Sequence, residues 1–159
     1  MMKKLLILVF WLGWFGSYAQ VSGSLQTQAQ DYAFNSVLQY VDIQVITPPT
    51  NVTVTALDSV AAPKLPVFIQ NFVLPAGSQV TGLQVNPTDL YTFNGTYYIA
   101  PVQPPCPVGQ VCDTVAPNPA VYSSHNPYPA QQARIVADRY IFDQHVVSVA
   151  VCPFRYIPK

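Results

Sequence analysis

The apolar residues of this chain recur in short runs with the period of β-strands. Residues 52–56 alternate aliphatic side chains with threonine, the pattern of a strand with one buried face. Residues 67–74 are apolar on both faces, which indicates a strand covered on both sides. A Leu-Pro pair stands at each end of this run, at 65–66 and at 74–75. Proline is tolerated at the first residue of a strand and just beyond its last, so these pairs predict a short, sharply delimited strand.

Other segments carry the same signals. Strands are predicted over residues 37–45, 80–85, 134–142 and 145–152, and a tight hairpin over 91–100 around Asn94-Gly95. Residues 101–129 are rich in proline and predict a long irregular crossover. Residues 20–32 are polar without a period of two, and we expect a flexible leader there. About seven short strands within residues 33–159 fit one all-β domain, most economically a β-sandwich of jelly-roll or Greek-key type.

Residues 1–19 have the organisation of a signal peptide. Lys3 and Lys4 precede the apolar residues 5–15, and a small-residue site places the expected cleavage between Ala19 and Gln20. A membrane anchor is the competing interpretation, but about 11 apolar residues fall short of the roughly 20 that cross a bilayer. We therefore expect secretion through the periplasm of a bacterium, with no membrane contact once the signal is removed.

Composition narrows the class of protein further. The chain has no glutamate and is rich in valine, tyrosine, threonine, phenylalanine and proline, which favours strands joined by proline-bearing loops. Two of its seven Lys and Arg residues lie in the signal, which leaves five against seven aspartates. Without a basic patch, nucleic acid is not an expected partner.

Three cysteines in a chain expected to be exported raise the question of pairing. Cys106 and Cys112 flank a short loop with Gly109 near its apex, a spacing compatible with a local disulfide. A metal site is the alternative, and it would need four ligands at a recognisable spacing, whereas no CxxC motif accompanies the pair. The alternation of the last strand places Cys152 facing inward, where we expect a buried, unreactive thiol. No cofactor is expected.

The sequence does not assemble a recognisable active site. A Cys/His pair would need contact, but Cys152 and His145 lie at opposite ends of one predicted strand, about 23 Å apart when extended. His125 belongs to a polar loop, and the aspartates are scattered singly along the chain. We therefore expect a chain that is not itself an enzyme.

Several short motifs occur in an order that resembles the propeptide of gingipain-type cysteine peptidases. They are Leu65-Pro66, Leu74-Pro75 with Gly77-Ser78, the run Ile99 to Pro105, Val121-Tyr122 with Tyr128-Pro129, and the ending Pro153-Phe154-Arg155-Tyr156-Ile157-Pro158. The resemblance covers roughly residues 50–158, and the ordered set is more specific than any single motif.

The resemblance implies a prosegment that assists folding and covers the cleft of a secreted cysteine endopeptidase until proteolysis removes it. The implied partner is the cognate peptidase domain, normally in the same chain. The candidate peptidase-facing loop lies in the proline-rich crossover and comprises Gln103, Pro104, Pro105, Val108, Val111, Tyr122 and His125. Proline lowers the entropy lost when such a loop is ordered against a partner.

Two departures from the family pattern bear on this interpretation. Residues 103–129 contain no Lys or Arg, so a basic plug for an Arg- or Lys-specific pocket cannot be carried over to this loop. The family continues past the final motif into the peptidase, whereas this sequence stops at Lys159, and we expect a prodomain truncated before the peptidase. The alternative is a stand-alone secreted β-sandwich that binds carbohydrate or a surface protein, with Tyr91, Phe93, Tyr97 and Tyr98 as a stacking platform.

Overall fold

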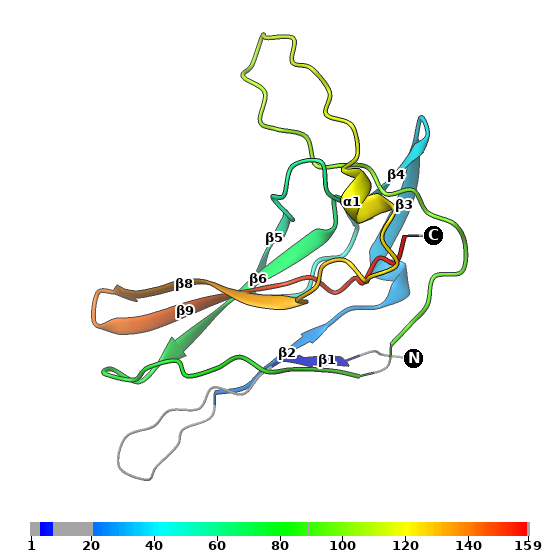
Figure 1. Cartoon of the computed structure of the whole chain (residues 1–159). Helices are drawn as coiled ribbons and strands as arrows, with labels where there is room; N and C mark the ends of the chain where they lie inside the picture. Colours follow the sequence, from blue (N-terminus) through cyan, green and yellow to red (C-terminus); the bar gives the residue numbers. More distant parts are fainter. Residues whose placement is uncertain (1–3, 8–20, 89, 159) are drawn as a thin grey trace.

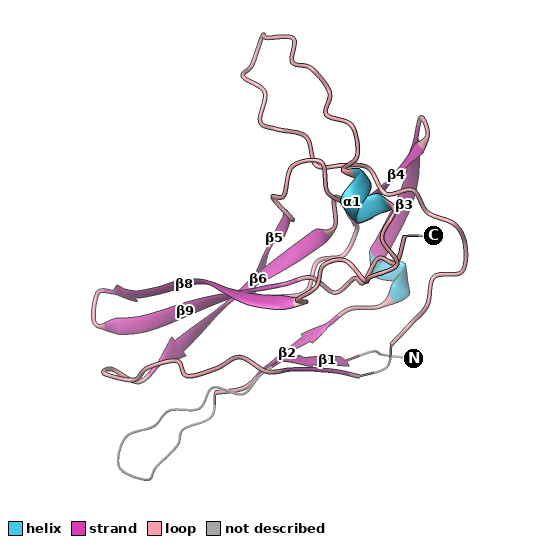
Figure 2. Cartoon of the chain, in the orientation of Figure 1, coloured by secondary structure: helices cyan, strands magenta, loops and turns pink. Residues whose placement is uncertain are grey.

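Strands dominate the structure, a computed structural model that describes residues 4–7, 21–88 and 90–158 (Figure 2). The strands are β1 (Lys4–Ile7), β2 (Gly23–Gln26), β3 (Tyr32–Val37), β4 (Tyr40–Val45), β5 (Val52–Ala56), β6 (Pro66–Leu74), β7 (Val85–Pro87), β8 (Ala133–Ile141) and β9 (Gln144–Val151). Within the described residues the helices are one 3-10 turn, η1 (Ala29–Asp31), and one short α-helix, α1 (Pro119–Tyr122). The all-β class predicted from the sequence is confirmed.

The strands form three antiparallel sheets (Figure 1). The largest has the order β5-β6-β9-β8, a second pairs β3 with β4, and a third has the order β2-β1-β7. At the centre of the largest sheet, β6 and β9 pair from Phe68 opposite Val151 to Leu74 opposite His145. This pairing joins segments more than seventy residues apart and holds the sheet together.

The core is built around the centre of the four-stranded sheet. Phe68, Val147 and Val149 are fully buried, and every residue of β9 after Gln144 is buried on either face. Two polar side chains of β9 are therefore buried, and each has a partner; the Ser148 hydroxyl donates a hydrogen bond of 2.6 Å to Asn71 Oδ1. Polar side chains are tolerated at these buried positions because residues of the neighbouring strands, Asn71 and Asp138, form hydrogen bonds with them.

The Leu-Pro pairs lie where the sequence predicts. Strand β6 begins at Pro66 and ends at Leu74, with Pro75 just outside it. Leu65 and Leu74 are both buried, so the leucines fix the two ends in the core. The prolines are then placed where no ladder hydrogen bond is lost.

The predicted flexible leader is wrong for the residues that the structure describes. Residues 23–26 form β2, and residues 29–31 form η1, which is closed by reciprocal hydrogen bonds between Gln28 and Asp31. Leu25 and Tyr32 are buried in the core. The polar composition of this segment conceals two large apolar side chains whose burial orders the backbone.

The segment assigned to the signal peptide is described only in part. Lys4–Ile7 forms β1 between β2 and β7, and the expected cleavage point between Ala19 and Gln20 lies outside the described residues. The signal peptide stays a prediction. In the described part of the chain, no helix has the length and apolar character needed to span a bilayer.

Three local predictions differ from the structure. The single strand over 37–45 is a hairpin of β3 and β4 that turns at Leu38, where φ is +56°. Residues 80–84 form no strand, and the hairpin around Asn94-Gly95 is absent. Residues 91–97 form an aromatic-rich loop, in which the Tyr97 hydroxyl donates to the Asn94 carbonyl at 3.1 Å. The rings of Phe93 and Tyr97 pack against Phe34 on β3 instead of pairing across the strands of a hairpin.

Core burial predicts a sharp contrast between two phenylalanines. Phe68 is 0% exposed and Phe142, at the β8–β9 turn, is 97% exposed. We expect Phe68→Ala to lower the free energy of unfolding by about 3–5 kcal/mol and Phe142→Ala by about 0.5 kcal/mol or less, measured by urea denaturation. Equal losses in the two variants would contradict the placement of the core.

Candidate functional site

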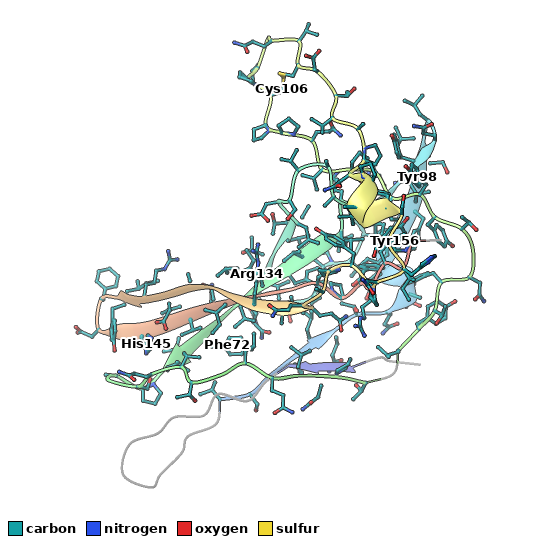
Figure 3. The ribbon with its side chains drawn as sticks, in the orientation of Figure 1. Phe72, Tyr98, Cys106, Arg134, His145 and Tyr156 are labelled. Atoms are coloured by element: carbon teal, nitrogen blue, oxygen red, sulfur yellow. A yellow bond between two sulfur atoms is a disulfide. The ribbon has the colours of Figure 1, made fainter. Side chains whose placement is uncertain are left out.

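The most prominent surface feature is a loop that projects from the body of the molecule (Figures 1 and 3). Residues 103–115, called here the projecting loop, contain no strand or helix. A disulfide joins Cys106 and Cys112, with Cα atoms 6.0 Å apart, which is the pair that the spacing suggests. The disulfide closes the outer part of the loop on itself, so the two cysteines are not available as metal ligands.

The base of the projecting loop is held by one side chain. Gln103 Oε1 accepts a hydrogen bond from the Val115 amide at 2.7 Å, and its Nε2 donates to the Val115 carbonyl at 3.0 Å. The same Nε2 atom lies 3.2 Å from the Pro101 carbonyl, to which it also donates. Gln103 thus imitates a β-bridge between the two arms of the loop and limits how far they can separate.

The tip of the projecting loop presents two valines to solvent. Val108 and Val111 have relative exposures of 104% and 103%. Between them Gly109 adopts a φ of +83°, which permits the tight turn, and the Gln110 amide donates to the Pro107 carbonyl at 3.2 Å. Two aliphatic side chains are therefore held outward on a closed loop, where only a partner could bury them.

Two residues of the candidate peptidase-facing set, Tyr122 and His125, lie outside the projecting loop. Tyr122 ends α1 and is buried, and its hydroxyl donates to the Ile99 carbonyl at 2.8 Å. Burial and the neighbouring tyrosines raise the pKa of Tyr122. His125 is exposed beyond α1. The other residues of that set lie in the projecting loop, and Tyr122 anchors the following segment to the body.

Gln103 offers a direct test of how the loop is held. In Gln103→Ala we expect the Val115 amide to exchange its hydrogen about tenfold faster, because its acceptor is lost. Amide exchange followed by NMR measures this, and Gln110→Ala, at the tip, is the matched control with an unchanged Val115 rate. An unchanged rate in Gln103→Ala would show that the Gln103 side chain does not order the base of the projecting loop.

Three polar side chains that the sequence analysis did not connect meet beside β9. His145 Nε2 lies 2.5 Å from Asp138 Oδ1, and His145 Nδ1 lies 3.3 Å from Ser78 Oγ. The Ser78 hydroxyl is closer to the Pro75 carbonyl, at 2.6 Å, and donates there. His145 is 3% exposed and lies under the ring of Tyr140, with centroids 4.8 Å apart. A serine nucleophile needs its proton directed to the imidazole and open access to substrate, so this arrangement acts as a clamp that ties the turn at Pro75 to the β8–β9 hairpin.

The clamp predicts that the two histidines contribute very differently to stability. His145→Ala removes two hydrogen bonds and a ring contact from a buried site, and we expect it to lower the free energy of unfolding by about 2–4 kcal/mol. His125→Ala, at an exposed position, is the matched control and should change it by about 0.5 kcal/mol or less. Thermal and urea unfolding of both variants measure the difference. Similar stabilities would exclude the clamp.

Cys152 is a free, buried thiol, as its strand position predicts. Burial raises its pKa to about 12, with a smaller opposing contribution from a backbone hydrogen bond with Phe154. At neutral pH the thiol is therefore protonated and a poor nucleophile. In the described part of the chain, no three His, Cys, Asp or Glu side chains gather in a way that could hold a metal ion.

The C-terminal motif, residues 153–158, lies beside Tyr128, whereas Leu74-Pro75 and Ser78 lie at the other end of β6, near His145. Tyr156 pairs with Tyr128 through two backbone hydrogen bonds of 2.7 and 2.8 Å, and Pro158 is buried. Pro153, Arg155 and Tyr156 line a cavity of about 680 Å³, called here the aromatic pocket. A second hollow of about 520 Å³ lies beside β8 and shares Arg155.

The chain was compared with models of protein families, with curated proteins and with solved structures, and no match was found in any of the three comparisons.

Proposed function

We propose that this chain is a non-catalytic prosegment of a secreted gingipain-like cysteine endopeptidase, which it helps to fold and keeps latent until it is removed. The observation that carries the proposal is the projecting loop, with its two fully exposed valines on a disulfide-closed turn. The order of the motifs from Leu65 to Pro158 supports it. The proposal includes a sandwich architecture of jelly-roll type and export through the periplasm with removal of the N-terminal signal.

Latency requires that the blocking element keep its shape when it meets the peptidase. The projecting loop is restrained at its base by Gln103 and in its outer part by the disulfide, so little conformational entropy is left to lose on binding. A loop that is already ordered also presents a poor substrate, because a peptidase needs an extended, adaptable segment in its cleft. The loop can therefore occupy a cleft without being cut quickly.

The chemistry of the tip indicates which kind of cleft it fits. Val108 and Val111 are small, branched and uncharged, and the projecting loop carries one charged residue, Asp113. A pocket that selects arginine or lysine would be left with an unpaired acidic group opposite these valines, at a substantial desolvation cost. We therefore propose a peptidase whose cleft near the loop is lined by aliphatic or aromatic side chains.

Inhibition kinetics test the latency role. The purified chain, added at micromolar concentration to the mature gingipain-type peptidase of the same organism, should slow the hydrolysis of a synthetic peptide substrate. Val108→Asp should weaken this inhibition about tenfold or more, because a carboxylate would be buried in an apolar cleft.

The control introduces the same charged residue, aspartate, at an exposed position outside the projecting loop. Leu38 is also almost fully exposed, on the β3–β4 turn, and Leu38→Asp should inhibit as well as the unaltered chain. No slowing by the unaltered chain would reject the latency role, whereas equal loss in both variants would reject the projecting loop as the contact.

A further inference from the structure

The aromatic pocket is independent of the projecting loop and has the size of a small-molecule site. Its volume of about 680 Å³ falls within the range of about 300–1,000 Å³ that is typical of ligand pockets. Its lining includes the buried side chains of Ile43, Leu65 and Ile99, so the pocket reaches the hydrophobic core. Apolar lining of this kind gains free energy when an apolar group covers it.

Aromatic rings from three separate segments form one continuous wall of the pocket. Phe34 on β3 lies 4.8 Å from Phe93 and 5.2 Å from Tyr97, both on the loop 91–97. Phe154, after β9, lies 6.5 Å from Phe34 and 6.0 Å from Phe93. These are distances at which rings attract one another edge to face or offset, and another flat ring can join the same arrangement.

One wall of the pocket can move to accommodate a ligand. Residues 91–97 form neither strand nor helix, and the ring contacts with Phe34 and Phe154 help to hold this loop against the body. Side-chain packing of this kind can be exchanged for packing on a ligand without breaking a β-ladder. The opposite side is formed by β3, which is paired with β4, and by buried core residues.

The lining of the aromatic pocket carries one positive charge and no negative charge among its described residues. Arg155 is the sole charged residue among the described residues that line the aromatic pocket, and its side chain forms no ion pair within the described part of the chain. Arginine binds a carboxylate in a planar, two-pronged geometry and does so best beside aromatic faces. A ligand with an anionic group at the rim and an apolar ring inside would complement both features.

We propose that the aromatic pocket binds a small aromatic carboxylate, with its ring packed against the wall formed by Phe34, Phe93 and Phe154 and its carboxylate at Arg155. A sugar fits less well, because its hydroxyl groups need partners on all sides, whereas the buried lining residues offer mostly aliphatic and aromatic surface, from Ile43, Leu65, Ile99, Tyr32 and Tyr122. The polar lining residues that could serve a sugar, such as Thr92, Asn94 and Thr96, are exposed on the outer loop.

Calorimetric titration of the full chain with three matched compounds tests the charge requirement. Indole-3-acetate, indole-3-acetamide and tryptamine share one ring and differ in charge. We expect indole-3-acetate to bind at least about fivefold more tightly than the neutral amide, and tryptamine to bind most weakly, as a single exposed charge contact predicts. Equal binding of all three, or no binding of the acid at millimolar concentration, would overturn the proposal.

Two variants test the residues. Arg155→Gln should bring the affinity for indole-3-acetate down to that of the amide and leave the amide unaffected, whereas Phe93→Ala should weaken both by about fivefold or more. Arg139→Gln removes an exposed charge on β8 and should change neither. Circular dichroism confirms that each variant is folded. An Arg155→Gln protein that keeps its preference for the acid would exclude the carboxylate contact, and tighter binding of a neutral oligosaccharide than of the acid would favour a sugar site instead.

Discussion

The pairing of β6 with β9 is the contact on which the rest of the molecule depends. It joins residues 68–74 to residues 145–151, and nearly every side chain of β9 is buried. A pairing between such distant segments is entropically costly to form, so it must be compensated by burial, and the fully buried Phe68, Val147 and Val149 supply that burial. The clamp at His145 and the segment after Cys152 are both positioned by this strand pair.

The same sheet explains how much could be predicted from the sequence. The ends of β6 were predictable because Leu-Pro pairs act locally, and the β8–β9 hairpin because its alternation is regular. The contacts of His145 were not predicted, because the predicted strands 134–142 and 145–152 place the turn at Asp143-Gln144. In the structure the turn is at Phe142-Asp143. The observed register sets Tyr140 opposite His145 and puts Asp138 on the same face, so the correct turn would have placed these two residues beside His145. Ser78 joins them only through the pairing of β6 with β9.

Elsewhere the sequence signal was weaker than the tertiary contacts that override it. The segment 21–32 has a polar composition, yet Leu25 and Tyr32 find places in the core. Asn94-Gly95 is a common hairpin turn, but the aromatic residues around it are held by Phe34 and Phe154, which lie far away in the sequence. A local sequence pattern cannot reveal either set of contacts, since both depend on which segments meet in the folded chain. The aromatic pocket could not be predicted for the same reason. It forms only where β3, the loop 91–97 and the C-terminal segment meet.

The two candidate surfaces differ in how their shape is maintained, and this difference separates what each can do. The projecting loop is restrained by a disulfide and by the hydrogen bonds of Gln103, and its two valines are fully exposed to solvent. It is suited to enter a cleft in another protein. The aromatic pocket has a floor of buried core residues and a wall held by ring contacts, so it is suited to receive a ligand. Because the projecting loop and the residues that line the pocket do not overlap, occupation of one surface leaves the contacts of the other intact.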